Sequence, residues 1–334
     1  LFVYNSDIAN CTPNSGNVRK GMSRDDIFIA VHDTFWTDSC MYADIVLPAD
    51  TALERTDCHW AYGSWYLGIN KPVIEPQGES VRNTELFRML ADKMGYVDST
   101  DNAFTQTDEE IIKDILLEAE NEDGERFNCL TEGINYDDVV KNGWARASTN
   151  SKRRDFLNSG WATPSGKIEI KCEAITAEYP DVSPFPEYVP EIKGQYDPLK
   201  SKYPIQVLSS ASHYFIGDSF QSVPRLQAMQ SRPTVELSVN DAKAREIKDG
   251  DLVRLYNEQA DTYCYAVIID GLLDGVCATQ KQFKGSNTPN GLNVNNLNTE
   301  MLTDFGKSPT FYSVLVEIEK ASEEMCKEAI KQGA

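Results

Sequence analysis

The stretch "MYADIVLPAD" (residues 41–50) contains the pattern that decides the fold class of this chain. The apolar run at residues 45–47 predicts a short buried strand. Pro48 ends that strand, because proline has no backbone N–H to donate to a neighbouring strand. Asp44 precedes the run, although a plain core strand needs no carboxylate there. We therefore predict that Asp44 accepts hydrogen bonds from backbone N–H groups and fixes the loop at residues 37–38.

Two further apolar runs precede this strand, and together the three predict a parallel sheet. They are "LFVY" (residues 1–4) and "IFIAVHD" (residues 27–33), and the polar residues 5–17 between them are expected to form a loop. Strands that are apolar throughout are typical of parallel sheets covered on both faces. Ligands bind to such sheets beyond the carboxyl ends of the strands. The residues expected near this edge are Asn5, Ser6, Asp7, His32, Asp33, Thr37, Pro48 and Asp50.

Two amphipathic helices are predicted after the sheet. In "NTELFRMLADKMG" (residues 83–95) the apolar residues recur at helical spacing, with Asn83 as the expected cap and Gly95 as the expected stop. The stretch "TDEEIIKDILLEAE" (residues 107–120) opens with a Thr and a Glu at capping-box spacing. We expect both helices to pack against a core rather than to carry a functional site.

The second half of the chain has the pattern of an all-β domain. Six candidate strands follow one another from Tyr203 onward, and turn signals such as "KDGD" and "GLLDG" separate several of them. This spacing predicts a β-barrel or a β-sandwich. A short helix is expected at residues 240–247 and a terminal helix at residues 323–332. The candidate strands are residues 204–210, 234–239, 251–257, 262–270, 275–280 and 313–319.

Charge and composition exclude several classes of function. The chain has 334 residues and a net charge of −20 at pH 7, which argues against binding to nucleic acid or to an anionic membrane surface. No apolar run is long enough to span a membrane. The basic patch at residues 152–154 is expected to be solvated surface or to meet a phosphate.

The cysteines and histidines give no metal-binding signature. None of the eight cysteines forms a Cys-x-x-Cys pair, and the three histidines are far apart in the sequence. Several cysteines, including Cys264 and Cys277, stand in apolar patterns and are expected to be small buried hydrophobic residues in a reducing compartment. No nucleophile elbow, phosphate-binding loop or dinucleotide fingerprint is present.

Five phrases, in their order along the chain, resemble the carboxyl-terminal half of the molybdopterin oxidoreductases of the dimethyl-sulfoxide-reductase superfamily. They are "VHDTFWTDSCMYADIVLPADTALE", "GINKPVIEPQGESVRNTELFRMLADKMG", "TPSGKIEI", "SVNDAKAREIKDGDLVRLYNEQ" and "NVNNLNTEMLTDFGKSPTFYSVLVEIE". A single phrase is moderately specific, whereas five in this order over two matching architectures are strongly specific. The resemblance covers nearly the whole chain and is least distinctive at residues 96–160.

The resemblance implies an α/β plus β fold, in which a partial doubly wound α/β domain precedes a carboxyl-terminal double-psi β-barrel. In that family the cofactor is a molybdenum or tungsten ion held by two molybdopterin guanine dinucleotides. The α/β region binds one dinucleotide and the barrel covers the pterins. The expected division is residues 1–95 for the tail of the α/β region, 96–185 for a mixed helical and irregular region, 186–199 for a Pro-rich connector, 200–320 for the barrel and 321–334 for a helical tail.

The resemblance also implies the cofactor-binding residues. Asp33 and Thr37 match a nucleotide-contacting Asp and Thr, and Asp38 is expected beside them. A carboxylate can accept from ribose hydroxyls or a guanine edge, and a hydroxyl can donate to phosphate. His213, in "SSASHYFIGDSF", matches a pterin-contacting histidine. The alternatives are that Asp33 caps the following turn and that His213 is a surface histidine. Other pterin-facing stretches imply contacts from Gln282, Phe283, Asn295, Phe311 and Tyr312.

Three departures from the family pattern bear on this interpretation. Asp7 and Ile8 stand where the family often has Asn-Pro, and Gly217 stands where an Asn is usual. Lys284 follows Phe283 where paired aromatic residues are common. The departures at Asp7, Ile8 and Gly217 leave open a second hypothesis, a binding or scaffolding protein that kept the fold and lost catalysis.

The chain is expected to be the carboxyl-terminal portion of an oxidoreductase of the kind used in anaerobic respiration. The family's iron–sulfur cysteines and its metal-ligating residue lie in an amino-terminal half, and this chain begins with an apolar strand and no Met. We therefore expect no catalytic or metal-ligating residue here, and no turnover by this chain alone. The expected partners are that amino-terminal half and electron-transfer subunits. The compartment is expected to be the cytoplasm or, through a twin-Arg signal on the other half, an exported location.

Overall fold

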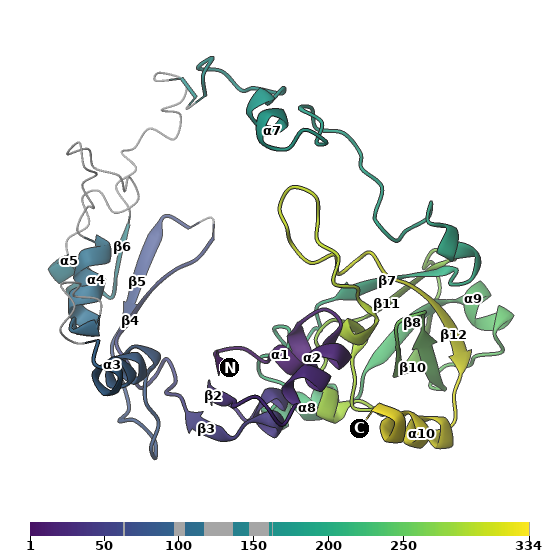
Figure 1. Cartoon of the computed structure of the whole chain (residues 1–334), viewed down its shortest axis with the longest axis horizontal. Coiled ribbons are helices and arrows are strands. Elements are labelled where there is room, and N and C mark those ends of the chain that lie inside the picture. Colours follow the sequence, from purple (N-terminus) through teal and green to yellow (C-terminus); the bar gives the residue numbers. More distant parts are fainter. Residues whose placement is uncertain (63, 97–103, 117–135, 147–159, 162, 334) are drawn as a thin grey trace. The chain divides into compact units, whose positions relative to one another are not determined.

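The chain forms two compact units. A computed structural model describes residues 1–62, 64–96, 104–116, 136–146, 160–161 and 163–333 (Figure 1). The first unit joins Leu1–Val46 to Ile170–Ala334, and the second is Leu47–Glu169. The domain division expected from the sequence stays a prediction. The basic patch at residues 152–154 lies outside the described residues. Among the described helices, none is long and apolar enough to cross a membrane.

The first unit opens with a three-stranded sheet in the order β1-β2-β3. Its strands are β1 (Phe2–Tyr4), β2 (Ala30–Asp33) and β3 (Ile45–Pro48), which confirms that the three apolar runs form strands. The prediction that residues 45–47 are buried is wrong, because β3 lies at the edge of the sheet, with Ile45 exposed and Val46 and Leu47 half-buried. β1 and β2 are parallel, with Val3 opposite Val31. Their carboxyl ends therefore meet at one edge, and the polar residues that follow both strands are brought together there.

The prediction of a polar loop at residues 5–17 is wrong. The segment contains α1 (Ile8–Cys11), and α2 (Ser15–Met22) begins within it. Ala9 and Met22 pack with Val3 and Val31 of the sheet in one buried cluster. The helices escaped prediction because they are short and present only a few apolar side chains to the sheet, between many polar ones.

Asp44 accepts a backbone hydrogen bond, as predicted, but from a different segment. Its Oδ2 lies 2.7 Å from the backbone N of Ile29, and its own backbone N donates to the Ile29 carbonyl oxygen at 2.9 Å. Ile29 immediately precedes β2. The carboxylate therefore fixes the start of β2 against the start of β3, and the loop at residues 37–38 is held by other groups.

The second half of the first unit is a closed barrel in the strand order β10-β8-β11-β7-β12-β9. All six predicted strands are confirmed, and closure decides between the barrel and the sandwich. Alternate residues of the strands face inward, and Cys264 and Cys277 lie in this core as expected. The strands are β7 (Ile205–Ser210), β8 (Thr234–Ser238), β9 (Leu252–Tyr256), β10 (Asp261–Ile269), β11 (Val276–Gln280) and β12 (Leu315–Lys320).

Short helices accompany the barrel in this unit. The predicted helices at residues 240–247 and 323–332 are confirmed as α9 and α10, whereas α8 was not predicted. Short helical turns fall after β2, before β7 and between β11 and β12. The elements are α7 (Glu173–Glu178), α8 (Pro224–Met229), α9 (Val239–Ala244), α10 (Glu323–Gly333), η1 (Asp38–Tyr42), η3 (Pro198–Ser201), η4 (Gly285–Asn287) and η5 (Val294–Leu297).

The second unit combines helices with an antiparallel sheet that was not predicted. The sheet consists of β4 (Asp57–Trp60), β5 (Tyr66–Asn70) and β6 (Trp144–Arg146). The helices are α3 (Asn83–Met94), α4 (Asp108–Leu116) and α5 (Tyr136–Asn142), of which α3 and α4 confirm the predicted helices.

The ends of these helices test the predicted capping residues. Asn83 is the first residue of α3 rather than its cap, which is Arg82. Gly95 ends α3 with a φ of 77°, a left-handed conformation that glycine adopts without strain. The capping box before α4 is confirmed, because Glu110 donates its backbone N–H to Thr107 Oγ1 at 3.2 Å and its carboxylate accepts from the Thr107 N–H at 2.7 Å.

Candidate functional site

Two loops leave the same end of the barrel, because β7 and β11 are parallel neighbours. The loop at residues 211–222 follows β7, and the loop at residues 281–298 follows β11. The first carries the predicted residue His213, and the second carries Gln282, Phe283 and Asn295. The topology of the barrel thus brings predicted residues from distant parts of the sequence to one end.

Gln221 joins these two loops. Its side chain is 1% exposed. Its Nε2 donates to the carbonyl oxygens of Gly217 at 2.7 Å and Gln282 at 2.8 Å, and its Oε1 accepts from the backbone N of Lys284 at 2.6 Å. One buried amide therefore satisfies three backbone groups. Gln221 could not be predicted from the sequence, since a single Gln in a polar loop gives no pattern.

The backbone at Gly217 explains one departure from the family pattern. Gly217 has a φ of 62°, and a Cβ placed there would lie 2.3 Å from Gln282 Oε1. Positive φ is accessible to glycine and, among the other residues, most readily to Asn and Asp. Gly217 and the usual Asn therefore suit the same backbone shape, and glycine leaves additional room for the Gln282 side chain.

Asn293 joins the barrel-end loop to α1 of the α/β part. Its Nδ2 lies 2.7 Å from Asn10 Oδ1, 3.1 Å from the Asn10 carbonyl oxygen and 2.8 Å from the Phe283 carbonyl oxygen. Asn295 donates its own Nδ2 to the Asn10 carbonyl oxygen at 2.9 Å and its backbone N to Asn293 Oδ1 at 2.9 Å. All three Asn side chains are buried. They form a continuous hydrogen-bonded group that holds the two parts of the unit together.

This arrangement places two predicted cofactor residues inside the fold. Asn295 is 0% exposed and Phe283 is 1% exposed. The Phe283 ring packs edge-on against Phe215, with 6.1 Å between the ring centroids. In this structure both side chains contact other parts of the protein interior, and their contact with a cofactor stays a prediction. The run of amides in "NVNNLN" was the sequence signal that could have pointed to a buried polar cluster at Asn293.

Asp38 lies in the same interface. It is 5% exposed, and its Oδ2 accepts from Arg19 at 3.3 Å and from the backbone N of Ser286 at 3.1 Å. Arg19 also donates to the carbonyl oxygens of Ala9 at 2.8 Å and Gly291 at 2.5 Å. Asp38 therefore connects the turn after β2 to the barrel-end loop.

Gly285, between Lys284 and Ser286, is tightly enclosed by this interface. A Cβ added to it would lie 2.5 Å from the Gly291 carbonyl oxygen and 2.9 Å from Asp38 Oδ2. Backbone and carboxylate atoms at these distances leave room only for hydrogen at this position. The close approach of the two parts therefore depends on glycine here.

Asp7 accounts for another departure from the family pattern. Its Oδ1 accepts from the backbone N and the hydroxyl of Ser39, at 2.9 and 2.7 Å, and its Oδ2 accepts from the backbone N of Asp38 at 3.2 Å. Burial raises the pKa of Asp7, and the hydrogen bonds from Ser39 oppose that rise. Both oxygens act as acceptors, so a carboxylate suits this position and fixes the start of η1.

Asp33 and Thr37, the predicted nucleotide contacts, flank the exposed loop between β2 and η1. Both are half-buried. Asp33 Oδ1 accepts from the backbone N of Phe35 at 3.0 Å, which is the turn-capping role named as the alternative. This bond uses one of its two carboxylate oxygens. The Thr37 hydroxyl lies 3.4 Å from Cys40 Sγ.

The remaining predicted residues lie at the barrel end without a direct link to Asp33. His213 is exposed and meets the Tyr214 ring edge-on at 4.9 Å between centroids. Tyr312 is 54% exposed. The carbonyl oxygens of Phe311 and Tyr312 accept from side chains of β7 at 3.5 and 3.3 Å. These residues present polar or aromatic side chains that a planar ligand could contact.

A group of acidic residues lies between the α/β part and the barrel. Burial raises the pKa of Asp218, and a hydrogen bond from the Cys11 thiol opposes that rise while the Asp33 charge adds to it. Burial also raises the pKa of Cys11, with the Asp218 and Asp7 carboxylates as further causes. The negative field here favours a base edge or a ribose over a phosphate group next to Asp33.

Among the described residues, no group of three or more His, Cys, Asp and Glu side chains is arranged to hold a metal ion. Seven cysteines in the described part are free thiols. The described site therefore consists of carboxylate, hydroxyl, amide and aromatic groups.

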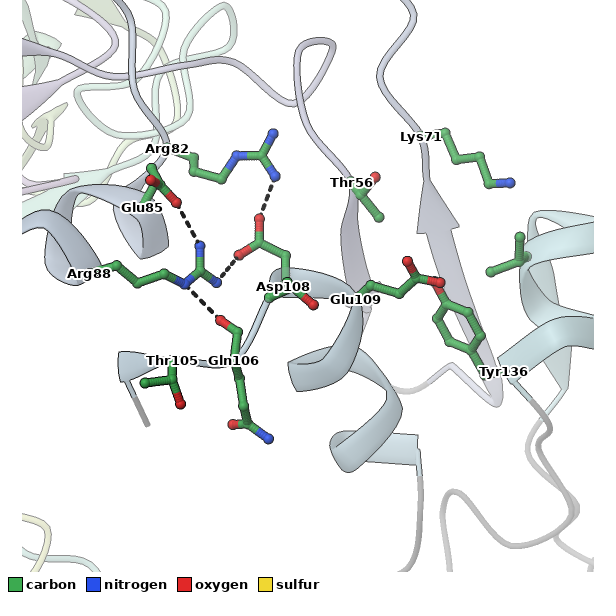
Figure 2. Close-up of a pocket in the computed structure, with 12 residues that line it drawn as sticks. Thr56, Lys71, Arg82, Glu85, Arg88, Thr105, Gln106, Asp108, Glu109 and Tyr136 are labelled. Atoms are coloured by element: carbon green, nitrogen blue, oxygen red, sulfur yellow. Dashed lines mark hydrogen bonds and ion pairs between the residues drawn. The ribbon is translucent and has the colours of Figure 1, made fainter. Parts of the chain in front are cut away.

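The second unit contains a cavity of about 450 Å³, and a cluster of ion pairs lines it (Figure 2). Arg82 and Arg88 point toward Asp108 and both form ion pairs with it. Arg88 also pairs with Glu85 at 3.0 Å and donates to the Gln106 carbonyl oxygen at 2.7 Å. The cluster connects α3 to the start of α4. Its charges neutralise one another, so neither Arg82 nor Arg88 offers a free cationic site.

Replacing Asp108 with Asn is expected to lower the free energy of unfolding of this unit by about 2 kcal/mol at pH 7, because two arginines lose their carboxylate. Burial opposes ionisation of Asp108, but hydrogen bonds from Thr84, Arg82 and Arg88 hold its pKa below 3.8. Its contribution is therefore complete above pH 3.8 and is lost as the pH falls through the lowered pKa. Urea unfolding as a function of pH measures this, and exposed Asp114→Asn is the control. Equal stabilities of the Asp108→Asn variant and the parent at pH 7 would contradict the ionic cluster.

The chain is similar to known proteins in both sequence and structure. The family model described as molybdopterin oxidoreductase matches residues 1–93, and the model described as molydopterin dinucleotide binding domain matches residues 205–315. A probable oxidoreductase, YoaE, of Bacillus subtilis is 32% identical over 321 residues, covering 96% of this chain and 44% of that protein. The dimethyl sulfoxide reductase DmsA of Escherichia coli is 26% identical over 317 residues, covering 87% and 38%.

Among solved structures, the acetylene hydratase from Pelobacter acetylenicus is similar in fold. Its TM-score is 0.74 at 18% identity, over 96% of this chain and 44% of that chain. The chain thus spans less than half the length of these relatives.

Proposed function

The chain belongs to the molybdopterin oxidoreductase family, and from this premise we propose that it supplies one nucleotide clamp and the pterin-covering barrel of a molybdopterin guanine dinucleotide enzyme. The proposed parent enzyme contains molybdenum or tungsten. The residues proposed to contact the cofactor directly are Asp33, Thr37, His213, Gln282 and Tyr312.

One observation carries this proposal. The loop after β2 and the loop after β11 are bonded to each other, through Lys284 Nζ to the Trp36 carbonyl oxygen at 2.8 Å and Ser286 N to Asp38 Oδ2 at 3.1 Å. These loops carry predicted cofactor residues from two different parts of the sequence. Their direct contact supports a single ligand site shared by the sheet edge and the barrel end.

The chemistry of the available groups fits the proposed ligand. One oxygen of Asp33 remains after its bond to Phe35 N, and a carboxylate can accept from the N–H groups of a guanine edge or from ribose hydroxyls. The Thr37 hydroxyl can donate to a phosphate oxygen. Exposed aromatic and imidazole groups at Tyr312 and His213 can contact a planar pterin. The site therefore combines a carboxylate acceptor and a hydroxyl for the nucleotide end with planar side chains for the pterin end.

The bound cofactor would supply electron transfer or oxygen-atom transfer at its metal. The residues of this chain have a different task. Asp33 and Thr37 would hold the nucleotide end, and the barrel-end loops would orient the pterin and limit its contact with water. Gln221 and Asn293 would keep these groups in position without touching the ligand.

We propose that the barrel is of the double-psi type and that the α/β part is one portion of a doubly wound domain completed by an amino-terminal half of the same polypeptide. Phe2 and Tyr4 alternate with the buried Val3 and are 36% and 48% exposed. Parallel sheets are normally covered on both faces, so the exposed rings are consistent with a further covering segment. That half would carry the metal ligand and the iron–sulfur motif and would contact electron-transfer subunits, so this chain alone would be inactive.

The alternative is a non-catalytic binding or scaffolding protein with the same fold. The departures at Asp7, Ile8 and Gly217 are the features that favour it. Asp7 and Gly217 have structural roles that are compatible with a ligand site, because Asp7 fixes η1 and Gly217 adopts a positive φ that Asn also tolerates.

The test is to produce the chain together with the upstream amino-terminal portion and to analyse the purified complex. We expect molybdenum or tungsten by elemental analysis and GMP released by acid hydrolysis. The Asp33→Ala variant should retain roughly tenfold less GMP, whereas exposed Asp26→Ala should retain as much as the parent. A folded complex without metal and without GMP would favour the scaffolding alternative.

A further inference from the structure

Lys284 stands where paired aromatic residues are common in the family, and its surroundings give it a specific role. Its backbone N–H donates to the buried Gln221 side chain at 2.6 Å. Its ammonium group donates to the Ser222 hydroxyl at 3.1 Å and to the Trp36 carbonyl oxygen at 2.8 Å. The backbone of Lys284 thus lies on the barrel-end loop, and its side chain contacts the loop between β2 and η1.

The position of Trp36 makes this contact informative. Trp36 lies between Asp33 and Thr37, the two proposed nucleotide contacts. Trp36 is 60% exposed and Phe35 is 39% exposed, and neither belongs to a hydrophobic core cluster of the described residues. A charge-assisted hydrogen bond to a backbone carbonyl is stronger than a neutral one and fixes the main chain directly.

The backbone at Lys284 is itself held in place. Gln221 holds its backbone N–H, and the adjacent Gly285 is enclosed by Asp38 and the Gly291 carbonyl oxygen. The Gly285 backbone N also donates to Asn10 Oδ1 at 3.1 Å. The Lys284 side chain can hold the loop at residues 33–37 only if its own backbone does not move. That backbone is fixed to both the barrel and the α/β part. The contact from Lys284 to the Trp36 carbonyl oxygen is called the tether below.

We propose that Lys284 is a positioning residue that sets the distance between the loop at residues 33–37 and the barrel, and thereby the retention of the guanine nucleotide end of the cofactor. This inference rests on the proposed function of the site. An aromatic residue at this position could not donate to the Trp36 carbonyl oxygen in the same way, so the tether distinguishes this chain from the common family pattern.

The experiment compares Lys284→Met, Lys284→Arg and Lys281→Met in the full protein purified with its cofactor. Met keeps the length and removes the charge, Arg keeps a donor, and Lys281 lies three residues earlier on the same loop. Amide hydrogen exchange of the segment at residues 33–40 should be roughly tenfold faster in Lys284→Met. It should be close to that of the parent in the other two variants.

The second readout is the half-time for loss of the nucleotide, followed as GMP recovered from the protein fraction after acid hydrolysis. It should shorten roughly fivefold in Lys284→Met and recover in Lys284→Arg, while the melting temperature stays within a few degrees of the parent. Unchanged exchange overturns the tether. Faster exchange with unchanged GMP retention, or equal loss in Lys281→Met, overturns the positioning role. A parent protein that yields no GMP contradicts the proposed function itself, and the exchange data still decide whether the tether exists.

Discussion

Replacing Asn293 with Asp is expected to lower the free energy of unfolding of the first unit by about 4 kcal/mol at pH 7. The Nδ2 group donates to Asn10 Oδ1, the Asn10 carbonyl oxygen and the Phe283 carbonyl oxygen, all within 3.1 Å. A carboxylate oxygen in its place would face three acceptors and donate to none of them. Because Asn293 is 4% exposed, water cannot replace the lost donor. Urea unfolding followed by far-ultraviolet circular dichroism measures the change.

The matched control is Asn287→Asp on the same loop. Asn287 is half-buried, and its Oδ1 accepts from Gln227 Nε2 at 3.1 Å, so a carboxylate preserves that bond. We expect a change below about 0.5 kcal/mol there. Similar losses in both variants would show that any negative charge on this loop is harmful, and would contradict the specific role of Asn293. A second readout is hydrogen exchange in α1, which should rise only in Asn293→Asp.

Replacing Gln221 with Leu should cost about 3 kcal/mol and should loosen both barrel-end loops. Leu is close to Gln in size, so the change mainly removes hydrogen bonds and leaves little cavity. The carbonyl oxygens of Gly217 and Gln282 and the backbone N of Lys284 lose their partner together. Hydrogen exchange at residues 213–222 and 281–286 should increase, while the barrel strands remain protected.

Gln227→Leu is the control for this substitution. Gln227 is half-buried in α8 and donates to one side chain, Asn287 Oδ1. Its loss should cost less than about 1 kcal/mol. If Gln221→Leu leaves loop exchange at the level of the parent, the two loops are held by other contacts and Gln221 does not organise the site.

The local elements were largely predictable because their causes are local. Apolar runs predicted β1, β2 and β3, and alternating patterns with turns predicted the six barrel strands. The capping box and Gly95 marked the boundaries of α3 and α4. α1 and α2 and the β4–β5–β6 sheet escaped, because short elements with polar faces give patterns that loops also give.

The candidate site was predictable in its parts and not in its contacts. Asp33 ends β2 and Thr37 follows it, and the family resemblance identified both without a structure. The same resemblance could not separate residues that would face a ligand from residues that hold the fold together. Asn295 illustrates this, because its amide donates to the Asn10 carbonyl oxygen inside the protein. An amide offers the same donor to a pterin or to a backbone carbonyl, and only its surroundings decide which it meets.

The sequence by itself therefore determined the strands of the first unit, the helices α3, α4, α9 and α10, and the family. It did so because apolar periodicity, capping residues and the phrases typical of the family all depend on residues that are close together in the sequence. The tertiary structure alone decided that the barrel closes, that Gln221 joins two loops, and that Lys284 reaches Trp36 across 248 positions of the chain. Hydrogen bonds between such distant residues leave no periodic trace, since their geometry exists only after the barrel and the sheet have formed.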